Sequence, residues 1–272
     1  MLKNSWLLSG VLSITLFAPN AWSWNQLGHQ LVAQIAYNHL SPHTKRIYNK
    51  YNHAIDYRSF VNAAPWLDTI RNPDDLAMHY IDIPFSPDKS AFSKPDRINA
   101  VSAIEKANKV LADQYSSLYA KGYALRILLH VVGDVHQPMH AVSMYSKRFP
   151  KGDKGGNLQR FKKNAIASNL HSWWDRGGGL LKAKNKYSNA QLGRRARAIE
   201  RRHPCETESM SLDPQVWANE SHEIAINQAY QVGLHQKPSK PYQSMTKAVS
   251  EERIALAGCR LAALLNKLAN SP

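Results

Sequence analysis

The segment from His130 to His140, HVVGDVHQPMH, constrains this chain more than any other. It holds three histidines and one aspartate within eleven residues. Residues four apart share one face of a helix, so His130 and Asp134 can project toward one point. A second pair with the same spacing, His171 and Asp175, follows about thirty residues later. The two pairs together predict a site for two metal ions.

The types of ligand in these pairs indicate the kind of site. Imidazole nitrogen and carboxylate oxygen without thiolate are typical of a hydrolytic zinc centre, and less so of a manganese or iron centre. Structural zinc sites usually include cysteine, so a catalytic role is favoured. A chain with 12 histidines also produces such pairs by chance, and a single histidine on an apolar helix face is more often a packed core residue. Two pairs so close together favour a metal site over coincidence.

The N-terminus has the parts of an export signal. Lys3 provides a positive charge, residues 5–18 form an apolar run that is short for a membrane span, and a small-x-small cleavage pattern ends at Ser23. Residues 1–23 are therefore predicted to be a signal peptide, and Trp24 the first residue of a secreted or periplasmic protein. An uncleaved membrane anchor is the alternative, disfavoured because polar residues interrupt and flank the apolar run.

Size and charge limit the remaining possibilities. The 272 residues can bury one full core, so residues 24–272 are predicted to form a single domain. The net charge of +15 suits a polyanionic partner. Much of this charge lies between Lys147 and Arg202, and includes the arginine-rich stretch 193–202. For that stretch a solvated helix face and a phosphate-binding surface remain equally open.

Apolar periodicity predicts an all-α fold. Helical patterns cover residues 27–36, 98–111, 123–135 and 244–268, and Asp213-Pro214 has the sequence of a helix start. Segments 84–95 and 236–242, rich in proline, serine and lysine, are predicted to be loops. Strand signals are sparse, and only residues 141–168 are compatible with a short hairpin.

The chain has two cysteines, Cys205 and Cys259. In an exported protein two cysteines most simply form a disulfide. This bond would tie the end of the arginine-rich stretch to the last helix. Two free buried thiols are the alternative.

Six short motifs carry a resemblance to a known family. They are WNxxGH from Trp24, WLDTIR (66–71), LAMHYID (76–82), HVVGDVHQPMH (130–140), GGN (155–157) and NLHSWWD (169–175). In order and approximate spacing they resemble the zinc-dependent single-strand-specific nucleases of the S1/P1 type, from Trp24 to about Asp175. The resemblance implies a compact all-α enzyme, related in fold to zinc phospholipase C. Such an enzyme hydrolyses RNA and single-stranded DNA to 5′-nucleotides and acts as a 3′-nucleotidase.

The resemblance also implies three zinc ions and their ligands. The first zinc would be held by Asp68, His79, His130 and Asp134, the second by His140, His171 and Asp175, and the third by the amino nitrogen and carbonyl oxygen of Trp24, by His29 and by a bridging Asp134. The other seven histidines are expected to be surface or structural groups. His136 lies between two ligands and could also orient one of them.

Clustered zinc suits phosphodiester hydrolysis, because paired ions lower the pKa of bound water and stabilise both the attacking and the leaving oxygen. By the resemblance, a metal-bound hydroxide lies between the first and third zinc and is oriented by Asp68, while the second zinc stabilises the departing 3′ oxygen. Arg71 and Asn157 occupy positions that bind the scissile phosphate, a task for which a planar guanidinium is well suited. For Arg71 a salt bridge on a helix surface is the alternative.

Tyr80 and Asp82 are expected to form the base pocket. In the family an aromatic ring at the first position stacks on a nucleobase, and the carboxylate accepts hydrogen bonds from the base edge. Stacking requires an unstacked base, so it favours single strands over duplex. Some relatives have phenylalanine where this chain has Tyr80. Without the resemblance Tyr80 would be interpreted as an ordinary half-buried aromatic residue.

Two other functions compete with a nuclease. A zinc-dependent phospholipase C would share the metal cluster, but the basic composition, Arg71 and the Tyr80/Asp82 pair argue against it. A secreted protein that binds nucleic acid or zinc without turnover would not need a ligand at every metal position. The favoured enzyme is a monomer whose substrates are RNA, single-stranded DNA and 3′-mononucleotides, without a membrane partner.

Overall fold

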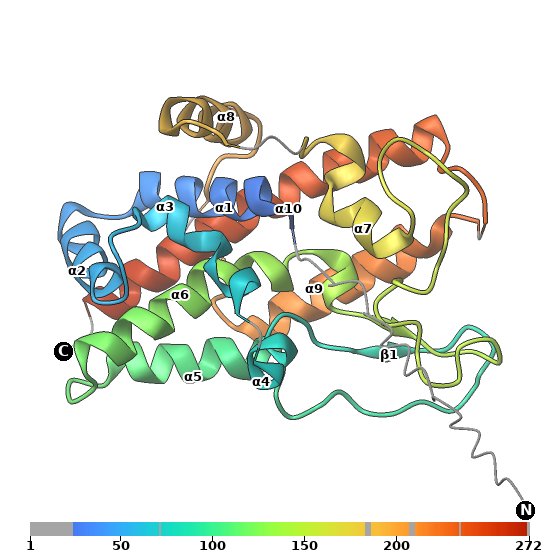
Figure 1. Cartoon of the computed structure of the whole chain (residues 1–272), viewed down its shortest axis with the longest axis horizontal. Helices are drawn as coiled ribbons and strands as arrows, with labels where there is room; N and C mark the ends of the chain where they lie inside the picture. Colours follow the sequence, from blue (N-terminus) through green and yellow to red (C-terminus); the bar gives the residue numbers. More distant parts are fainter. Residues whose placement is uncertain (1–23, 71, 183–185, 207–209, 234, 271–272) are drawn as a thin grey trace, which may run out of the picture.

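The computed structural model describes residues 24–70, 72–182, 186–206, 210–233 and 235–270 (Figure 1). The predicted signal peptide, residues 1–23, and Arg71 lie outside these ranges. The elements are α1 (Gln26–His39), α2 (Pro42–His53), α3 (Phe60–Ala63), η1 (Ala64–Thr69), α4 (Pro73–Ala77), β1 (Pro84–Phe85), α5 (Ala100–Ala112), α6 (Leu118–Val135), η2 (Pro138–His140), β2 (Ser143–Met144), α7 (Leu170–Asp175), η3 (Gly177–Gly179), α8 (Asn189–Arg202), α9 (Pro214–Asn227), η5 (Ala229–Gln231) and α10 (Lys240–Ala269). The prediction of an all-α fold is confirmed.

Side-chain caps determine where the long helices begin. Ser117 opens α6 by accepting a hydrogen bond from the backbone N–H of Ala120, and Asp213 opens α9 as its sequence predicts. The predicted C-terminal limit of loop 236–242 is wrong. Ser239 caps α10, and Pro241 lies in the first turn of this helix. A proline there removes no helical hydrogen bond, so it starts a helix instead of breaking one.

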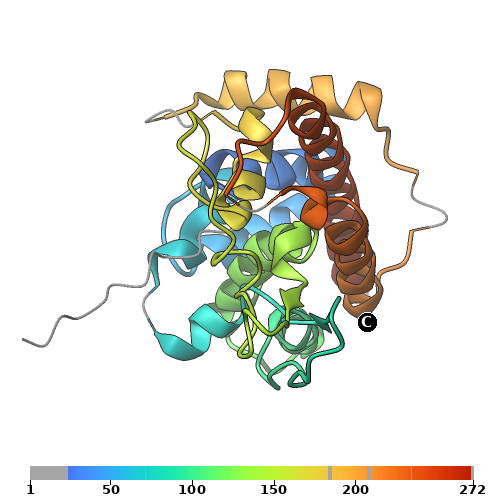
Figure 2. The ribbon, with the colours of Figure 1, turned by 90° about the vertical axis from the view of Figure 1, so that its right-hand side faces the viewer.

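The core is built around the pairing of the first and last helices. α1 packs along α10, α6 contacts both, and α5 packs against α6 (Figure 1). α1 and α10 are in close contact at Gly258, where an added Cβ would lie 2.6 Å from the Cβ of Ile35. α8 covers the outer side of α1 (Figure 2). Across the described ranges, none of the helices is both long and apolar enough to cross a membrane.

The short hairpin expected within residues 141–168 takes a different form. β2 pairs in parallel with β1, so that Pro84 aligns with Ser143 and Phe85 with Met144. The expected hairpin region has two isolated antiparallel bridges, one between Ser146 and Phe149 and one between Arg160 and the adjoining Asn169. This short ladder joins two segments that are far apart in the sequence, and it fixes the chain that follows His79 against the chain that follows His140.

The disulfide between Cys205 and Cys259 is present, as predicted, with Cα atoms 5.4 Å apart. Cys205 lies in the segment after α8, and Cys259 is buried within α10. The bond therefore ties the chain that leaves α8 to the helix that closes the core.

Candidate metal centre and active site

Asp68, His79 and His130 form the first group of potential metal ligands. They come from η1, from the segment after α4 and from α6. The Nε2 atom of His130 lies 3.0 Å from the Nδ1 atom of His79 and 3.5 Å from the Oδ1 atom of Asp68. One ligand atom of each residue therefore faces a shared point.

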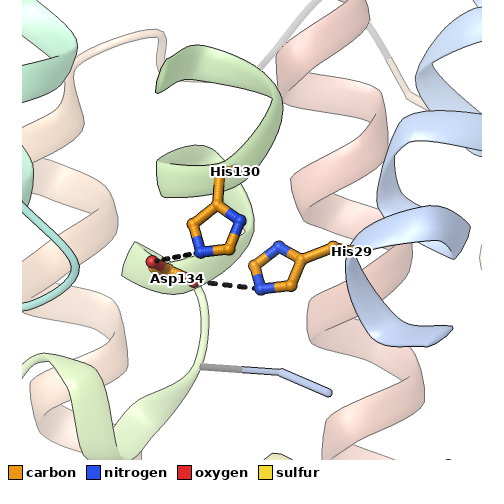
Figure 3. A group of neighbouring side chains, drawn as sticks. All are labelled: His29, His130 and Asp134. Atoms are coloured by element: carbon orange, nitrogen blue, oxygen red, sulfur yellow. Dashed lines mark ion pairs between the residues drawn. The ribbon is translucent and has the colours of Figure 1, made fainter. Parts of the chain in front are cut away.

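Asp134 lies between this group and His29. Its Oδ2 atom is 3.0 Å from Nδ1 of His79 and 3.4 Å from Nε2 of His130. Its Oδ1 atom is 3.4 Å from Nε2 of His29, which reaches across from α1 (Figure 3). His29, His130 and Asp134 form a second group that could hold a metal ion. The two oxygens of one buried carboxylate thus face different histidines, which is the arrangement that a bridging ligand requires.

His140, His171 and Asp175 form the third group. The Oδ1 atom of Asp175 lies 3.8 Å from Nε2 of His140 and 3.7 Å from Nε2 of His171. Both Nε2 atoms are buried and have no hydrogen-bond partner within the described part of the chain. Because buried polar atoms are rarely left without a partner, these nitrogens and the facing carboxylate fit a bound cation.

Backbone carbonyl groups orient three of the histidine rings. Nδ1 of His130 donates to the carbonyl oxygen of Ala64 at 2.8 Å, and Nδ1 of His171 donates to that of Gly155 at 2.7 Å. Nδ1 of His140 donates to the carbonyl oxygen of His79 at 2.6 Å. A carbonyl oxygen can only accept, so each Nδ1 atom carries the proton. The unprotonated Nε2 atom then faces the group, as in known metal sites.

Burial disfavours charge on the histidines of the three groups and on Asp134 and Asp175. Burial lowers the pKa of His29 and of His130 well below the usual value, so both are neutral and able to act as ligands near pH 7. Burial also raises the pKa of Asp134 well above its usual value, and that of Asp175 to about 7. Carboxylates collected in such a place are stabilised by a cation among them.

Trp24 is fully buried beside Asp134. Its indole Nε1 donates to the backbone carbonyl oxygen of Gly133 at 2.9 Å, and the backbone N–H of Asn25 donates to the carbonyl oxygen of Asp175 at 3.1 Å. The glycine of the WNxxGH motif makes this placement possible, because a Cβ on Gly28 would lie 2.6 Å from the Cβ of Trp24. The N-terminal motif therefore brings the start of the described chain against Asp175 of the third group and against Gly133, which precedes Asp134.

Asn157 and Gly155 lie in a loop held by two residues that sequence reasoning missed. Asp153 is fully buried and accepts hydrogen bonds from the hydroxyl group of Tyr230 at 2.8 Å, from Nε2 of Gln159 at 3.1 Å and from the backbone N–H of Met144. Gly155 has a φ of +58° and accepts the hydrogen bond from His171. The loop that orients a metal-group histidine therefore depends on a tyrosine that lies 77 residues after Asp153.

Tyr80 and Asp82 are half-buried on the segment that follows His79. The backbone N–H of Ile81, between them, donates to the carbonyl oxygen of His140 at 2.8 Å. Burial raises the pKa of Asp82 to about 6, and the negative charges of Asp153 and Asp96 contribute to this rise. Burial also raises the pKa of Tyr80, with a further contribution from Asp82. The two residues expected to form the base pocket thus lie next to the metal groups.

His136 has a structural role and is not a potential ligand. Its Nδ1 donates to the carbonyl oxygen of Val132 at 2.7 Å, and its Nε2 accepts from Arg260 at 3.0 Å. Arg260 in turn binds the carboxylate of Glu220 at 2.7 Å. This network joins the end of α6 to α9 and α10.

Comparison with known proteins agrees with this geometry. The family model described as S1/P1 Nuclease matches residues 24–270. Nuclease S1 of Aspergillus oryzae is 26% identical over 281 residues, which cover 94% of this chain and 95% of that protein. Endonuclease 3 of Arabidopsis thaliana is 25% identical over 97% of this chain and 94% of its own length. Nuclease P1 of Penicillium citrinum is 27% identical over 56% of this chain and 57% of its own. The chain therefore belongs to the S1/P1 nuclease family of enzymes.

Proposed function

We propose that this chain is a secreted, zinc-dependent endonuclease and 3′-nucleotidase that hydrolyses RNA and single-stranded DNA to 5′-nucleotides. The observation that carries the proposal is the position of Asp134, whose two oxygens face different histidines within a buried set of three His/Asp groups. A structural metal site needs only one ion with a complete set of ligands. Neighbouring metal sites instead suit a reaction in which two oxygens of one phosphate gain negative charge.

Three zinc ions are assigned to residues that the structure brings together and to the N-terminus. The ligands are Asp68, His79, His130 and Asp134 for the first, His140, His171 and Asp175 for the second, and the amino nitrogen and carbonyl oxygen of Trp24, His29 and Asp134 for the third. When bound, zinc would supply positive charge to the phosphate oxygens and would lower the pKa of a coordinated water.

Asp68 is assigned to orient the attacking water. It is only partly buried, whereas His130 and Asp134 of the same cluster are fully buried. A carboxylate in this position can accept a hydrogen bond from a water molecule and hold it in line with the phosphorus atom. Arg71 and Asn157 are assigned to bind the scissile phosphate, Arg71 through the two parallel donors of its guanidinium.

Substrate selection is assigned to Tyr80 and Asp82. The Tyr80 ring would stack on an unpaired base, and the Asp82 carboxylate would accept hydrogen bonds from the base edge. Stacking contributes about 1–3 kcal/mol per base and is possible for all four bases. It therefore discriminates between single strands and duplex more than between base sequences.

A secreted or periplasmic location is supported by the disulfide and by the export-signal pattern of residues 1–23. We assign residues 24–272 to one catalytic domain that acts as a monomer.

A product-release assay tests the proposed function. Purified protein is incubated separately with RNA, single-stranded DNA, duplex DNA and phosphatidylcholine, and its zinc content is measured by mass spectrometry. We expect 5′-nucleotides from RNA and single-stranded DNA, slower release from duplex and about three zinc ions per chain. Phosphocholine release without nucleotide release would assign a phospholipase C, and absence of all products from the zinc-loaded protein would indicate a binding protein.

A further inference from the structure

Helix α8 presents a strongly basic face that takes no part in the metal centre. Its apolar side, made by Leu192, Ala196 and Ile199, is buried. The helix packs on α1. Arg194, Arg197 and Arg201 are exposed. Spacings of three and four residues place these three arginines on one face, over about 10 Å of helix axis.

The basic face has no internal partner that would explain it. Glu200 is the only acidic residue between Lys182 and His203, and it binds His39 at 3.1 Å on the α1 side. Within the described ranges, Arg194, Arg197 and Arg201 form no ion pair with a carboxylate. The helix dipole favours a cation only at Arg201, in the last turn, and like charges three and four residues apart destabilise a helix. Helix stability therefore does not account for this stripe.

An open hollow of about 420 Å³ adjoins the N-terminal end of the stripe. It is lined by Lys182, Tyr187, Gln191, Arg194 and Arg195. The Tyr187 hydroxyl donates to the carbonyl oxygen of Lys182 at 2.7 Å, and the Arg195 guanidinium lies over the Tyr187 ring at 5.4 Å. A hollow with cationic side chains held in this way suits a phosphate group, since a guanidinium binds phosphate through two parallel donors.

The hollow begins next to the chain that forms the metal centre. Leu181, which precedes Lys182, accepts a hydrogen bond at its carbonyl oxygen from Nδ2 of Asn25 at 2.7 Å. The backbone N–H of Asn25 donates to the carbonyl oxygen of Asp175, a residue of the third metal group. These two hydrogen bonds connect the start of the hollow to the third metal group.

We propose that this surface, defined as Lys182, Arg194, Arg195, Arg197 and Arg201, binds the phosphate backbone of a single-stranded polynucleotide outside the cleavage site. The inference rests on the proposed nuclease function and adds an affinity for long chains over short ones. Phosphate contacts carry no base information, so the surface serves every sequence equally. An anionic membrane is the less suitable partner, because such helices insert large apolar residues beside their basic face. Among the described residues, none of the large exposed apolar side chains lies on α8.

The test compares a polymer with a dinucleotide that is too short to reach from the cleavage site to α8. In the triple variant Arg194→Gln/Arg197→Gln/Arg201→Gln, KM for polyadenylate should rise about tenfold at low salt. The plot of log KM against log salt should become shallower by about 2, because each phosphate contact on a single strand contributes about 0.7. The kcat on polyadenylate and both constants on the dinucleotide should not change.

Matched variants separate this surface from general charge. Lys50→Gln/Lys106→Gln/Lys109→Gln removes the same charge from exposed positions on α2 and α5 and should leave the salt slope unchanged. Replacing the three α8 arginines by lysine should restore most of the affinity for polyadenylate. Circular dichroism checks that each variant is folded.

Three results would overturn the inference. The first is an unchanged KM for polyadenylate in the α8 glutamine variant, and the second is an equal change of KM in the Lys50/Lys106/Lys109 variant. The third is that wild type binds phosphatidylglycerol vesicles and the α8 variant does not, while the polyadenylate kinetics of the variant stay normal. Failure of the nuclease function itself would look different, because wild type would then cleave neither polyadenylate nor the dinucleotide.

Discussion

His140 donates a hydrogen bond of 2.6 Å from its Nδ1 atom to the backbone carbonyl oxygen of His79. The two residues belong to different metal groups, so the ring orientation in one group depends on the backbone of a residue in the other. The backbone N–H of Ile81 donates back to the carbonyl oxygen of His140 at 2.8 Å, which makes the connection reciprocal. The three groups are therefore one connected structure, and a variant in one group needs a matched variant in another for its effect to be interpreted.

Asp134→Ala should lower the zinc content of the protein more than replacement of a ligand that contacts only one ion. Asp134 faces both His29 and the His79/His130 pair, so two ions would lose a ligand at once. We expect activity on every substrate to fall more than about a hundredfold, and the melting temperature to fall because metal binding and folding are linked. His171→Ala is the single-group comparison, and Asp113→Ala is the surface control. Equal zinc loss in the Asp134 and His171 variants, measured by mass spectrometry, would contradict a bridging role.

Asp82 should give substrate binding a pH dependence centred near pH 6. Its pKa is raised to about 6, so its carboxylate is charged above this pH and neutral below it. KM for 3′-nucleotides should rise as the pH falls through 6, and Asp82→Asn should lack this step.

The stability of the fold should depend on the protonation of Asp82 in the opposite direction. The folded-state pKa lies above the ordinary 3.8, so the stability contributed by protonated Asp82 is complete below about pH 4 and is lost as the pH rises through 6. Asp82→Asn should therefore raise the melting temperature more at pH 8 than at pH 5, and an equal shift at both would contradict the assigned pKa.

The free amino group of Trp24 should be required for full activity. The nitrogen lone pair of a peptide bond is delocalised, so Trp24 can serve as an amine ligand only as the first residue of the chain. One additional residue before Trp24 should lower zinc occupancy and kcat while the His140/His171/Asp175 group stays filled. The alternative is that Trp24 only packs beside the centre, as its buried indole and its hydrogen bond to Gly133 allow. Full activity with full zinc in the extended protein would establish that alternative.

Tyr230→Phe should weaken the third metal group although Tyr230 is not one of its ligands. The change removes the hydroxyl hydrogen bond to buried Asp153 at a cost of about 1–3 kcal/mol, and loosens the loop that holds Gly155 against His171. We expect easier zinc loss to a chelator and a higher KM, with a smaller effect on kcat. Tyr115→Phe, at a residue 86% exposed, is the control. Loss of thermal stability without a change in chelator sensitivity or KM would limit Tyr230 to a structural role.

Gly258→Ala should destabilise the fold by about 1–3 kcal/mol, since the added Cβ would lie 2.6 Å from Ile35. The comparison is Gly193→Ala in α8, where the nearest atom is the end of the flexible Arg197 side chain at 3.3 Å. In that helix interior the change should stabilise by about 0.5–1 kcal/mol, because alanine is the better helix former. Urea unfolding of both variants measures the difference, and equal effects would show that α1 and α10 adjust to the added methyl group.

The sequence predicted the residues of the three potential metal groups better than the residues that support them. His130/Asp134 and His171/Asp175 were found because helical spacing places such pairs on one face, and Asp68, His79 and His29 because they lie in recognisable motifs. Tyr230 and Asp153 were missed because neither belongs to a periodic pattern, and their contact spans about eighty residues. The parallel pairing of β1 with β2 was missed for the same reason, since two-residue strands have no detectable alternation. Long-range contacts between single side chains leave no local signal in a sequence.

The pairing of α1 with α10 has a consequence for how the protein becomes active. His29 is on α1, the first of the described helices, and α1 packs along α10, which is synthesised after the other described helices. Contacts between such distant segments form late, because a long loop must close first. A nascent or truncated chain can therefore contain every histidine and aspartate of the centre and still fail to bring them together. The 30 residues of α10 include none of the assigned ligands, yet synthesis of this helix determines when the enzyme first becomes able to cut.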